Sequence, residues 1–219
     1  MTTETDQNNL KEIYALENDH GHATTSMIAE RLGYSPATVT GQLKKLSGRD
    51  LVLYSPYQGA TLTESGRAAA LEIIRHHRLL ETYLARALKV PWDRVHGEAE
   101  KLEHAISEYL EERIDTLLDH PDVDPHGSPI PSREGVMRSN GSLRLADLPV
   151  GTHAKIVEVN DRDPALLARL EELRLHPGAR VEIIAIEPVD GLITIRISGA
   201  LETLGQTSAS QLIVRRIRT

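Results

Sequence analysis

The sequence contains no cysteine, no phenylalanine and only one tryptophan among its 219 residues. Without cysteine there can be no disulfide scaffold, no thiolate metal site and no cysteine nucleophile. Long apolar runs are absent too, since none approaches the roughly 18 residues that a membrane-spanning helix needs. The first nine residues are polar and acidic, which is not the pattern of a secretory signal. We therefore expect a protein of the cytoplasm with no membrane partner.

Positive charge is also in short supply, because 25 Lys and Arg face 32 Asp and Glu and the formal net charge is −7. This balance speaks against unselective coating of nucleic acid, since affinity for phosphates comes from Lys and Arg. It leaves open a DNA-binding protein with its basic residues on one face, and a protein whose carboxylates bind a cation. Histidine, by contrast, is plentiful at ten residues. Five of them lie in one central stretch, at His76, His77, His96, His104 and His120.

Three segments with different sequence patterns predict an α+β protein. Residues 1–75 indicate short helices followed by a hairpin, 76–141 helices that end in a Pro-, Gly- and Ser-rich linker, and 142–219 β-branched runs. In the second segment we expect an all-α dimerisation domain with one helix from Val95 to Leu118 and the linker from Pro121 to Ser142. In the third we expect a small SH3-like β-barrel with a helix between its strands. Its predicted elements are strands over 154–159, 181–186, 192–197 and 212–217 and a helix over 164–175.

The first segment has the element order of a winged helix-turn-helix. Ser35 and Pro36 open its second motif helix as the N-cap and the first helical residue. That helix carries small or polar residues near its N-terminus, where a recognition helix approaches base edges, and lysines beyond them that can reach phosphates. The predicted DNA-contacting residues are Ser35, Pro36, Ala37, Thr38, Thr40, Gln42, Lys44 and Lys45. An ordinary three-helix protein-interaction module is the alternative.

A set of metal-ligating residue types stands at helical spacing in the second segment. Glu100, Glu103 and His104 fall at i, i+3 and i+4 of the predicted helix and would project from one face. The preceding helix carries His77 and Glu81 at i and i+4, so two antiparallel helices could direct both sets into one gap. Carboxylates and imidazoles without sulfur suit a divalent cation such as Mn²⁺ or Fe²⁺. A solvated charged face is the alternative, as is a metal-dependent hydrolase, although the His-Glu-x-x-His signature is absent.

Together, these segments resemble the diphtheria toxin repressor and manganese transport regulator family of metal-dependent transcriptional regulators. The likeness covers nearly the whole chain, including a C-terminal segment similar to the SH3-like or FeoA-like module of the longer members. The motifs that carry it are Ile-Ala-Glu-Arg-Leu at 28–32, Ser-Pro-Ala-Thr-Val-Thr at 35–40, Leu-Thr-Glu-Ser-Gly at 62–66, Arg-His-His-Arg-Leu-Leu-Glu at 75–81, His-x-Glu-x-Glu-x-x-Glu-His at 96–104 and Pro-His-Gly-Ser-Pro-Ile-Pro at 125–131.

The resemblance implies two metal sites per subunit. Their ligands would be Asn8, Glu100, Glu103 and His104 in one site, and His77, Glu81, His96 and a barrel residue, Asp163 or Asp161, in the other. Iron-sensing members carry Cys where this chain has Glu100 and manganese-sensing members carry Glu, so the resemblance favours Mn²⁺ over Fe²⁺. Asn8 offers a neutral carbonyl where manganese-sensing members have a carboxylate. Lys11 stands where those members have a bridging Glu, so a closely bridged two-metal cluster is not expected.

The sequence thus predicts a homodimeric, manganese-responsive transcriptional regulator that is not an enzyme. By resemblance it is a repressor of metal-homeostasis genes that binds a palindromic double-stranded DNA operator. An iron-responsive regulator of the same family is the main alternative. A hydrolase using Glu100, Glu103 and His104 would leave the helix-turn-helix unexplained, and a regulator that responds to a small molecule is a third alternative.

Overall fold

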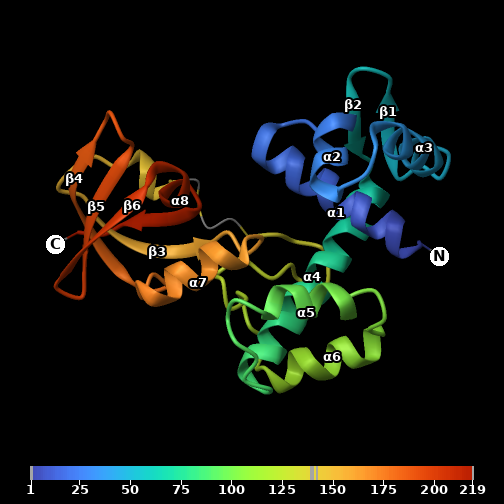
Figure 1. Ribbon diagram of the computed structural model, residues 1–219. Helices are drawn as coiled ribbons and strands as arrows, with labels where there is room; N and C mark the ends of the chain where they lie inside the picture. Colours follow the sequence, from blue (N-terminus) through green and yellow to red (C-terminus); the bar gives the residue numbers. More distant parts are fainter. Residues whose placement is uncertain (1, 139–140, 142, 219) are drawn as a thin grey trace. The chain divides into compact units, whose positions relative to one another are not determined.

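The computed structural model describes residues 2–138, 141 and 143–218, which form an α+β protein (Figure 1). These residues make two compact units. The first contains the described residues of 1–77, 103–106 and 131–137, and the second contains those of 78–102, 107–130 and 138–219. The predicted linker over 121–142 and the predicted domain boundary at 142 fall partly on residues 139, 140 and 142, which lie outside the described residues.

The first unit is the predicted winged helix-turn-helix (Figure 1). Its elements are α1 (Glu4–His20), α2 (Thr25–Leu32), α3 (Pro36–Ser47), β1 (Val52–Ser55), β2 (Gly59–Leu62) and the start of α4 (Glu64–Arg86). Thr24 and Ser35 cap α2 and α3 through side chains that accept hydrogen bonds from backbone N–H groups of the first turn. Gly33 ends α2 at φ 67°, a left-handed conformation that glycine adopts without strain. The sharp turn into α3 therefore follows from local sequence.

One apolar core holds these helices and the hairpin together. Leu10, Ile13 and Leu16 of α1 are buried with residues of α2, β1 and β2. From α3 the core takes Val39 and Leu43, spaced four residues apart on one face. The opposite face of α3 is left to solvent, which is the arrangement that a DNA-reading helix requires.

The helical part of the second unit corrects one sequence prediction. Instead of one helix from Val95 to Leu118, the chain forms α5 (Val95–Leu102) and α6 (Glu108–Leu117). Ser107 starts α6 as its N-cap, and its side chain accepts a hydrogen bond from the Leu110 N–H (3.3 Å). Glu103 and His104 consequently lie in a turn, so the predicted common helix face for them is wrong. Among the described residues, no helix combines the length and the apolar character needed to cross a bilayer.

The C-terminal part of the second unit is a small antiparallel sheet of the SH3-like kind. Its strands are β3 (His153–Val159), β4 (Arg180–Glu187), β5 (Leu192–Ile197), β6 (Ala200–Gly205) and β7 (Leu212–Arg216), in the order β6-β5-β4-β3-β7. Short helices accompany it: η1 (Leu145–Asp147), α7 (Pro164–Glu172) and α8 (Gln206–Ser210). The sequence prediction missed β6, because this edge strand buries only Leu204 and so lacks a strong apolar pattern. The strands and α7 enclose an apolar core that includes Ile156, Leu167 and Ile183.

Candidate metal centre

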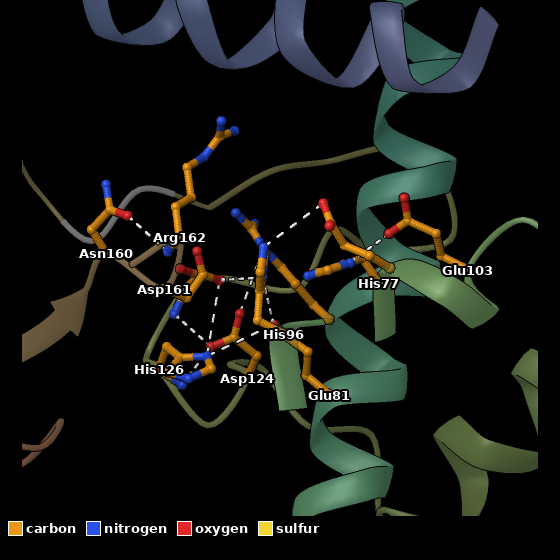
Figure 2. A network of polar contacts seen from close by, with 12 residues as sticks. His77, Glu81, His96, Glu103, Asp124, His126, Asn160, Asp161 and Arg162 are labelled. Carbon is orange, nitrogen blue, oxygen red and sulfur yellow. Dashed lines mark hydrogen bonds and ion pairs between the residues drawn. The ribbon is translucent and has the colours of Figure 1, made fainter. Parts of the chain in front are cut away.

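Five ionisable side chains of the second unit converge on one point, and we call them the Glu81 cluster (Figure 2). They come from α4, α5, the loop after α6 and the segment after β3. The members are Glu81, His96, Asp124, His126 and Asp161. Glu81, Asp124 and His126 are buried, and the other two are partly buried. The burial of three carboxylates with two imidazoles is costly unless protons or a cation balance their charge.

The ligating atoms of this cluster lie within reach of one another. His96 Nδ1 is 3.1 Å from Glu81 Oε1 and 3.5 Å from Asp161 Oδ2. His126 Nδ1 is 3.8 Å and 3.9 Å from the same two oxygens. Glu81, Asp124 and His126 offer three atoms within 4.8 Å of one another, and so do Glu81, His96 and Asp161. The spacing suits a single cation held between the side chains.

A tight loop fixes Asp124 and His126 in this position. Asp124 Oδ1 accepts hydrogen bonds from the backbone N–H groups of His126 (2.8 Å) and Ser128 (3.0 Å). The His126 carbonyl accepts the N–H of Val159 in β3 (2.9 Å). At Gly127 φ is 89°, and a Cβ there would lie 2.0 Å from the Val157 carbonyl oxygen, so only glycine allows this approach. The predicted linker is therefore a buried loop over these residues.

The contacts of His126 would suit a metal-ligating imidazole. Its Nε2 lies 3.1 Å from the Trp92 carbonyl oxygen, which can only accept, so Nε2 carries a proton. In the neutral ring Nδ1 then holds a lone pair directed at the cluster, and a backbone carbonyl that orients a ligand histidine in this way is a common feature of metal sites. Among the described residues, neither this Nδ1 nor Asp124 Oδ2 has a hydrogen-bond partner, although Arg78 Nε lies 3.6 Å from that oxygen.

The electrostatics of the cluster show how its charge is balanced without a metal. Burial and the Glu81 carboxylate raise the pKa of Asp124 well above its ordinary value. Burial lowers the pKa of His96, but hydrogen bonds with Asp161 and Glu81 outweigh it and raise that pKa to about 10. The pKa of His126 is raised as well, because the Glu81 and Asp161 carboxylates more than offset the effect of burial. In the metal-free protein, bound protons thus balance the negative charge that a divalent cation would balance on binding.

The donor set fits a divalent metal. It offers carboxylate oxygens and imidazole nitrogens and no sulfur, which suits Mn²⁺ or Fe²⁺ better than a soft cation. Asp161 is positioned by an Asx turn in which the Arg162 N–H donates to Asn160 Oδ1 at 3.0 Å (Figure 2). Asp163, the barrel residue predicted as a ligand, is exposed and caps α7 by accepting hydrogen bonds from two backbone N–H groups. The geometry therefore favours Asp161 over Asp163.

The first unit holds a second group of such side chains, which we call the Glu103 cluster: Gln7, Lys11, His77, Glu103 and His104. The Glu103 carboxylate is buried, and its Oε2 lies 2.5 Å from His77 Nδ1 (Figure 2). Its Oε1 accepts a hydrogen bond from Lys11 Nζ at 2.6 Å. Burial raises the pKa of Glu103, but His77 and Lys11 have the larger effect and lower it. This carboxylate is therefore ionised and paired with the Lys11 ammonium of the protein itself.

Two other predicted ligands, His104 and Glu100, have partners that the sequence did not predict. The amide of Gln7, rather than that of Asn8, lies beside His104: Gln7 Oε1 is 2.8 Å from His104 Nδ1. Asn8 is partly buried on α1. Glu100 is half-exposed near the end of α5 and approaches His96, with 3.8 Å between its Oε1 and Nε2 of the imidazole. His77 lies one turn before Glu81 on α4.

The exposed face of α3 carries most of the predicted DNA-contacting residues. Ser35, Pro36, Ala37, Thr38, Lys44 and Lys45 are exposed. Thr40 and Gln42 are partly buried, and each already has a partner: Thr40 Oγ1 donates to the Pro36 carbonyl, and Gln42 Oε1 accepts a hydrogen bond from Asn9 of α1. Of the predicted DNA-contacting residues, those in the N-terminal turn of α3 and its two lysines are thus the exposed ones.

Asp124 and His126 were not predicted as ligands from the sequence. Their segment, Pro-His-Gly-Ser-Pro-Ile-Pro at 125–131, carries part of the family resemblance, but its composition indicates an exposed linker. A His and an Asp two residues apart, next to a glycine inside such a loop, were the available signal. Only the fold brings them to Glu81, more than 40 positions earlier in the chain.

Comparison with known proteins places the whole chain in one family. Residues 1–60 match the iron dependent repressor N-terminal DNA binding domain, 63–132 the iron dependent repressor metal binding and dimerisation domain, and 143–216 the FeoA domain. Iron-dependent repressor IdeR of Mycobacterium tuberculosis is 34% identical over 186 residues, which cover 80% of this chain and 81% of the relative. The diphtheria toxin repressor of Corynebacterium diphtheriae is 30% identical over 200 residues, covering 87% of each chain.

Solved structures agree. A manganese-dependent transcriptional repressor in complex with manganese has a TM-score of 0.90 at 35% identity, covering 97% of this chain and 100% of that one. The manganese regulator SloR has a TM-score of 0.82 at 30% identity, covering 97% and 98%. The chain therefore belongs to the iron-dependent repressor family of metal-dependent, DNA-binding transcriptional repressors, which includes IdeR and the diphtheria toxin repressor.

Proposed function

We propose that this protein is a manganese-responsive homodimeric repressor of metal-homeostasis genes. It binds a palindromic DNA operator through α3, and its operator affinity rises when Mn²⁺ binds the Glu81 cluster. The observation that carries the proposal is the convergence of Glu81, Asp124 and His126, all buried, on one point with ligand atoms within 4.8 Å. The chain's place in a family of metal-dependent repressors supports it.

The choice of Mn²⁺ rests on the donors and on the relatives. Oxygen and nitrogen ligands without cysteine favour a harder divalent ion. Similar solved structures are named for manganese, whereas the curated relatives are named for iron. Fe²⁺ is therefore the second candidate, because the same carboxylates and imidazoles can bind it. Operator binding titrated with each ion in anaerobic buffer separates them, and Mn²⁺ is expected to act at the lower concentration.

The Glu81 cluster suits a switch because its members come from distant parts of the sequence. Glu81 lies on α4, a single helix that begins at Glu64 directly after the winged hairpin. His96, Asp124, His126 and Asp161 bring in α5, the loop after α6 and the C-terminal sheet segment. When bound, a divalent ion supplies positive charge that offsets the repulsion among the carboxylates. The bound ion can raise operator affinity only as far as it binds the DNA-competent state more tightly than the other state of the protein. Glu103 and His104, which the resemblance implies as ligands of another site, already have partners within the protein in Lys11, His77 and Gln7.

Operator recognition in this proposal uses a two-fold arrangement. A homodimer places two α3 helices on two half-sites of a palindrome, separated by about one turn of DNA, near 34 Å. Ser35, Ala37 and Thr38 face the base edges, and Lys44 and Lys45 meet phosphates. Substitution of either lysine by Ala is expected to weaken binding to all sequences alike and to reduce the salt slope by about 1. The exposed Lys101, which pairs with Glu98 on α5, is the control lysine.

The direct test compares wild-type protein with Glu81→Gln and Glu98→Gln, in operator binding by fluorescence anisotropy with and without Mn²⁺. Glu98 is an exposed α5 carboxylate outside the cluster, so its substitution matches the charge change. We expect Mn²⁺ to raise the operator affinity of wild type and Glu98→Gln and to leave that of Glu81→Gln nearly unchanged. Metal-independent affinity, equal in all three proteins, would refute the proposed switch.

A further inference from the structure

The Glu103 cluster contains a cation that belongs to the protein itself. Lys11 Nζ lies 2.6 Å from Glu103 Oε1, and the two side chains are 13% and 0% exposed. The pair joins α1 to the turn between α5 and α6 within the first unit. Removing one partner of such a buried ion pair leaves the other charge buried without compensation, which is strongly destabilising.

The rest of the cluster shows how the site around Glu103 is filled. Its second oxygen, Oε2, is occupied by His77 Nδ1. Its first oxygen, besides receiving the hydrogen bond from Lys11, is 3.3 Å from His104 Nε2. Neither Glu103 nor His104 belongs to the two groups of three or more His, Asp or Glu that converge among the described residues. The ammonium thus neutralises the buried carboxylate while contributing no ligand atom.

We propose that the Lys11 ammonium takes the place of a divalent ion at Glu103, so that the Glu103 cluster binds one ion fewer than it would with a carboxylate at position 11. This deepens the proposed function and rests on its premise that the chain binds divalent ions. The tethered ammonium does two things that an ion would do there: it balances the Glu103 charge and it ties α1 to the turn. Lys11 therefore sets how many ions one subunit takes up.

The first test counts bound ions. Wild type, Lys11→Glu and Lys101→Glu are equilibrated with saturating Mn²⁺ in dialysis, and Mn per chain is measured by atomic absorption. Lys101→Glu has the same charge change on the exposed face of α5. We expect Lys11→Glu to bind one more ion per chain than wild type and Lys101→Glu to bind the same number. Adding Glu103→Gln to Lys11→Glu is expected to abolish the gain. An unchanged count in folded Lys11→Glu overturns the proposal.

The second test separates this role from a merely structural ion pair and also serves if Lys11→Glu does not fold. Lys11→Gln removes the charge with little change in size, and its melting temperature without metal is expected to fall by roughly 5 °C or more relative to wild type. Saturating Mn²⁺ is expected to restore most of this loss, because an ion replaces the ammonium. A deficit that persists in full under Mn²⁺ overturns the proposal.

Failure of this inference and failure of the proposed function give different results. If the Glu81 cluster does not bind metal, Glu81→Gln and wild type bind the same number of Mn ions per chain. The Lys11 inference is decided by the difference between the Lys11 variants and wild type, whatever the Glu81 cluster contributes to both.

Discussion

The Glu81 cluster and the Glu103 cluster contain the same kinds of side chain, carboxylates and imidazoles, but their charges are balanced in different ways. In the Glu103 cluster the carboxylate has an ammonium on one oxygen and an imidazole on the other, and its pKa is lowered. In the Glu81 cluster, burial and the Glu81 carboxylate raise the pKa of Asp124, whereas the pKa of Asp161 is lowered because the hydrogen bond with His96 outweighs the effect of burial. His126 Nδ1 and Asp124 Oδ2 accept no hydrogen bond from the described residues. The charges of the first arrangement are paired within the protein, whereas we propose that a cation completes the second.

The largest expected effect comes from neutralising one carboxylate in each cluster. Glu103→Gln leaves Lys11 buried without its counter-charge, so the metal-free protein is expected to lose about 3 kcal/mol of its free energy of unfolding. Asp124→Asn replaces a carboxyl whose pKa is already raised with an amide of the same shape and keeps an Oδ1 acceptor for the loop. The metal-free protein is therefore expected to keep its stability while its Mn²⁺ affinity falls at least about tenfold. Urea unfolding and Mn²⁺ titration measure the two quantities. An equal loss of unfolding free energy in both variants would contradict the claim that the two clusters balance their charges in different ways.

The pH dependence is the next effect in size. The pKa of His96 is raised to about 10, so this imidazole is protonated at neutral pH in the metal-free protein. Its interaction stabilises the folded state fully below the unfolded pKa of about 6.5, and this stability is lost as pH rises through about 10. Because a ligand imidazole must lose its proton, Mn²⁺ affinity is expected to increase with pH between 7 and 9, by up to about tenfold per unit for each proton released.

Calorimetry in buffers of different ionisation enthalpy counts these protons directly. His96→Gln removes the titrating group and is expected to release fewer protons on binding Mn²⁺. Proton release equal to that of wild type would show that the balance of charge in the Glu81 cluster does not depend on His96.

A smaller effect tests the loop that carries Asp124 and His126. Gly127→Ala and Gly178→Ala both place a Cβ on a residue with positive φ, 89° and 100°, but only the first meets backbone, at 2.0 Å from the Val157 carbonyl oxygen. Gly178→Ala is expected to cost about 1 kcal/mol of conformational strain, and Gly127→Ala is expected to cost more because its Cβ would collide with backbone. Only Gly127→Ala is expected to weaken Mn²⁺ binding as well, as measured by titration of Trp92 fluorescence. Trp92 is a suitable reporter because its ring centroid lies 5.1 Å from that of His126. Equal Mn²⁺ affinity in the two variants would contradict the positioning role of the loop.

The smallest effect distinguishes two neighbouring aspartates. Asp163→Ala removes the N-cap of α7 and is expected to cost about 1 kcal/mol of stability without any change in Mn²⁺ affinity. Asp161→Asn keeps the side-chain shape beside His96 but removes the charge, so it is expected to lower Mn²⁺ affinity. A loss of affinity in Asp163→Ala alone would favour Asp163 over Asp161, the two barrel residues that the resemblance implies as candidate ligands.

Local features of the fold could be predicted from the sequence, since caps and turns depend on neighbouring residues. Ser35 before Pro36 and Gly33 after Leu32 define the helix-turn-helix without any tertiary information. The break between α5 and α6 could not be predicted in this way, because the Glu–His spacing continues a helical pattern. The turn places buried Glu103 against Lys11, a residue 92 positions away in the sequence.

The residues of the candidate site could likewise be predicted from the sequence only in part. Glu81 and His96 were predicted as ligands, and the structure brings them together. Asp124 and His126 lie in a stretch whose Pro, Gly and Ser content indicates a linker, and their burial depends on the close approach of Gly127 to β3. Asp161 differs from Asp163 only in the backbone turn around it, which sequence spacing does not reveal.

The most direct test of the central claim is anomalous scattering at the manganese edge from a crystal of the full chain soaked with Mn²⁺. The account predicts a strong peak among Glu81, Asp124, His126 and Asp161, with ligand oxygens and nitrogens at about 2.0 to 2.3 Å. A crystal with saturating Mn²⁺ that shows no peak there, while His96 keeps its hydrogen bond to Glu81, would contradict it.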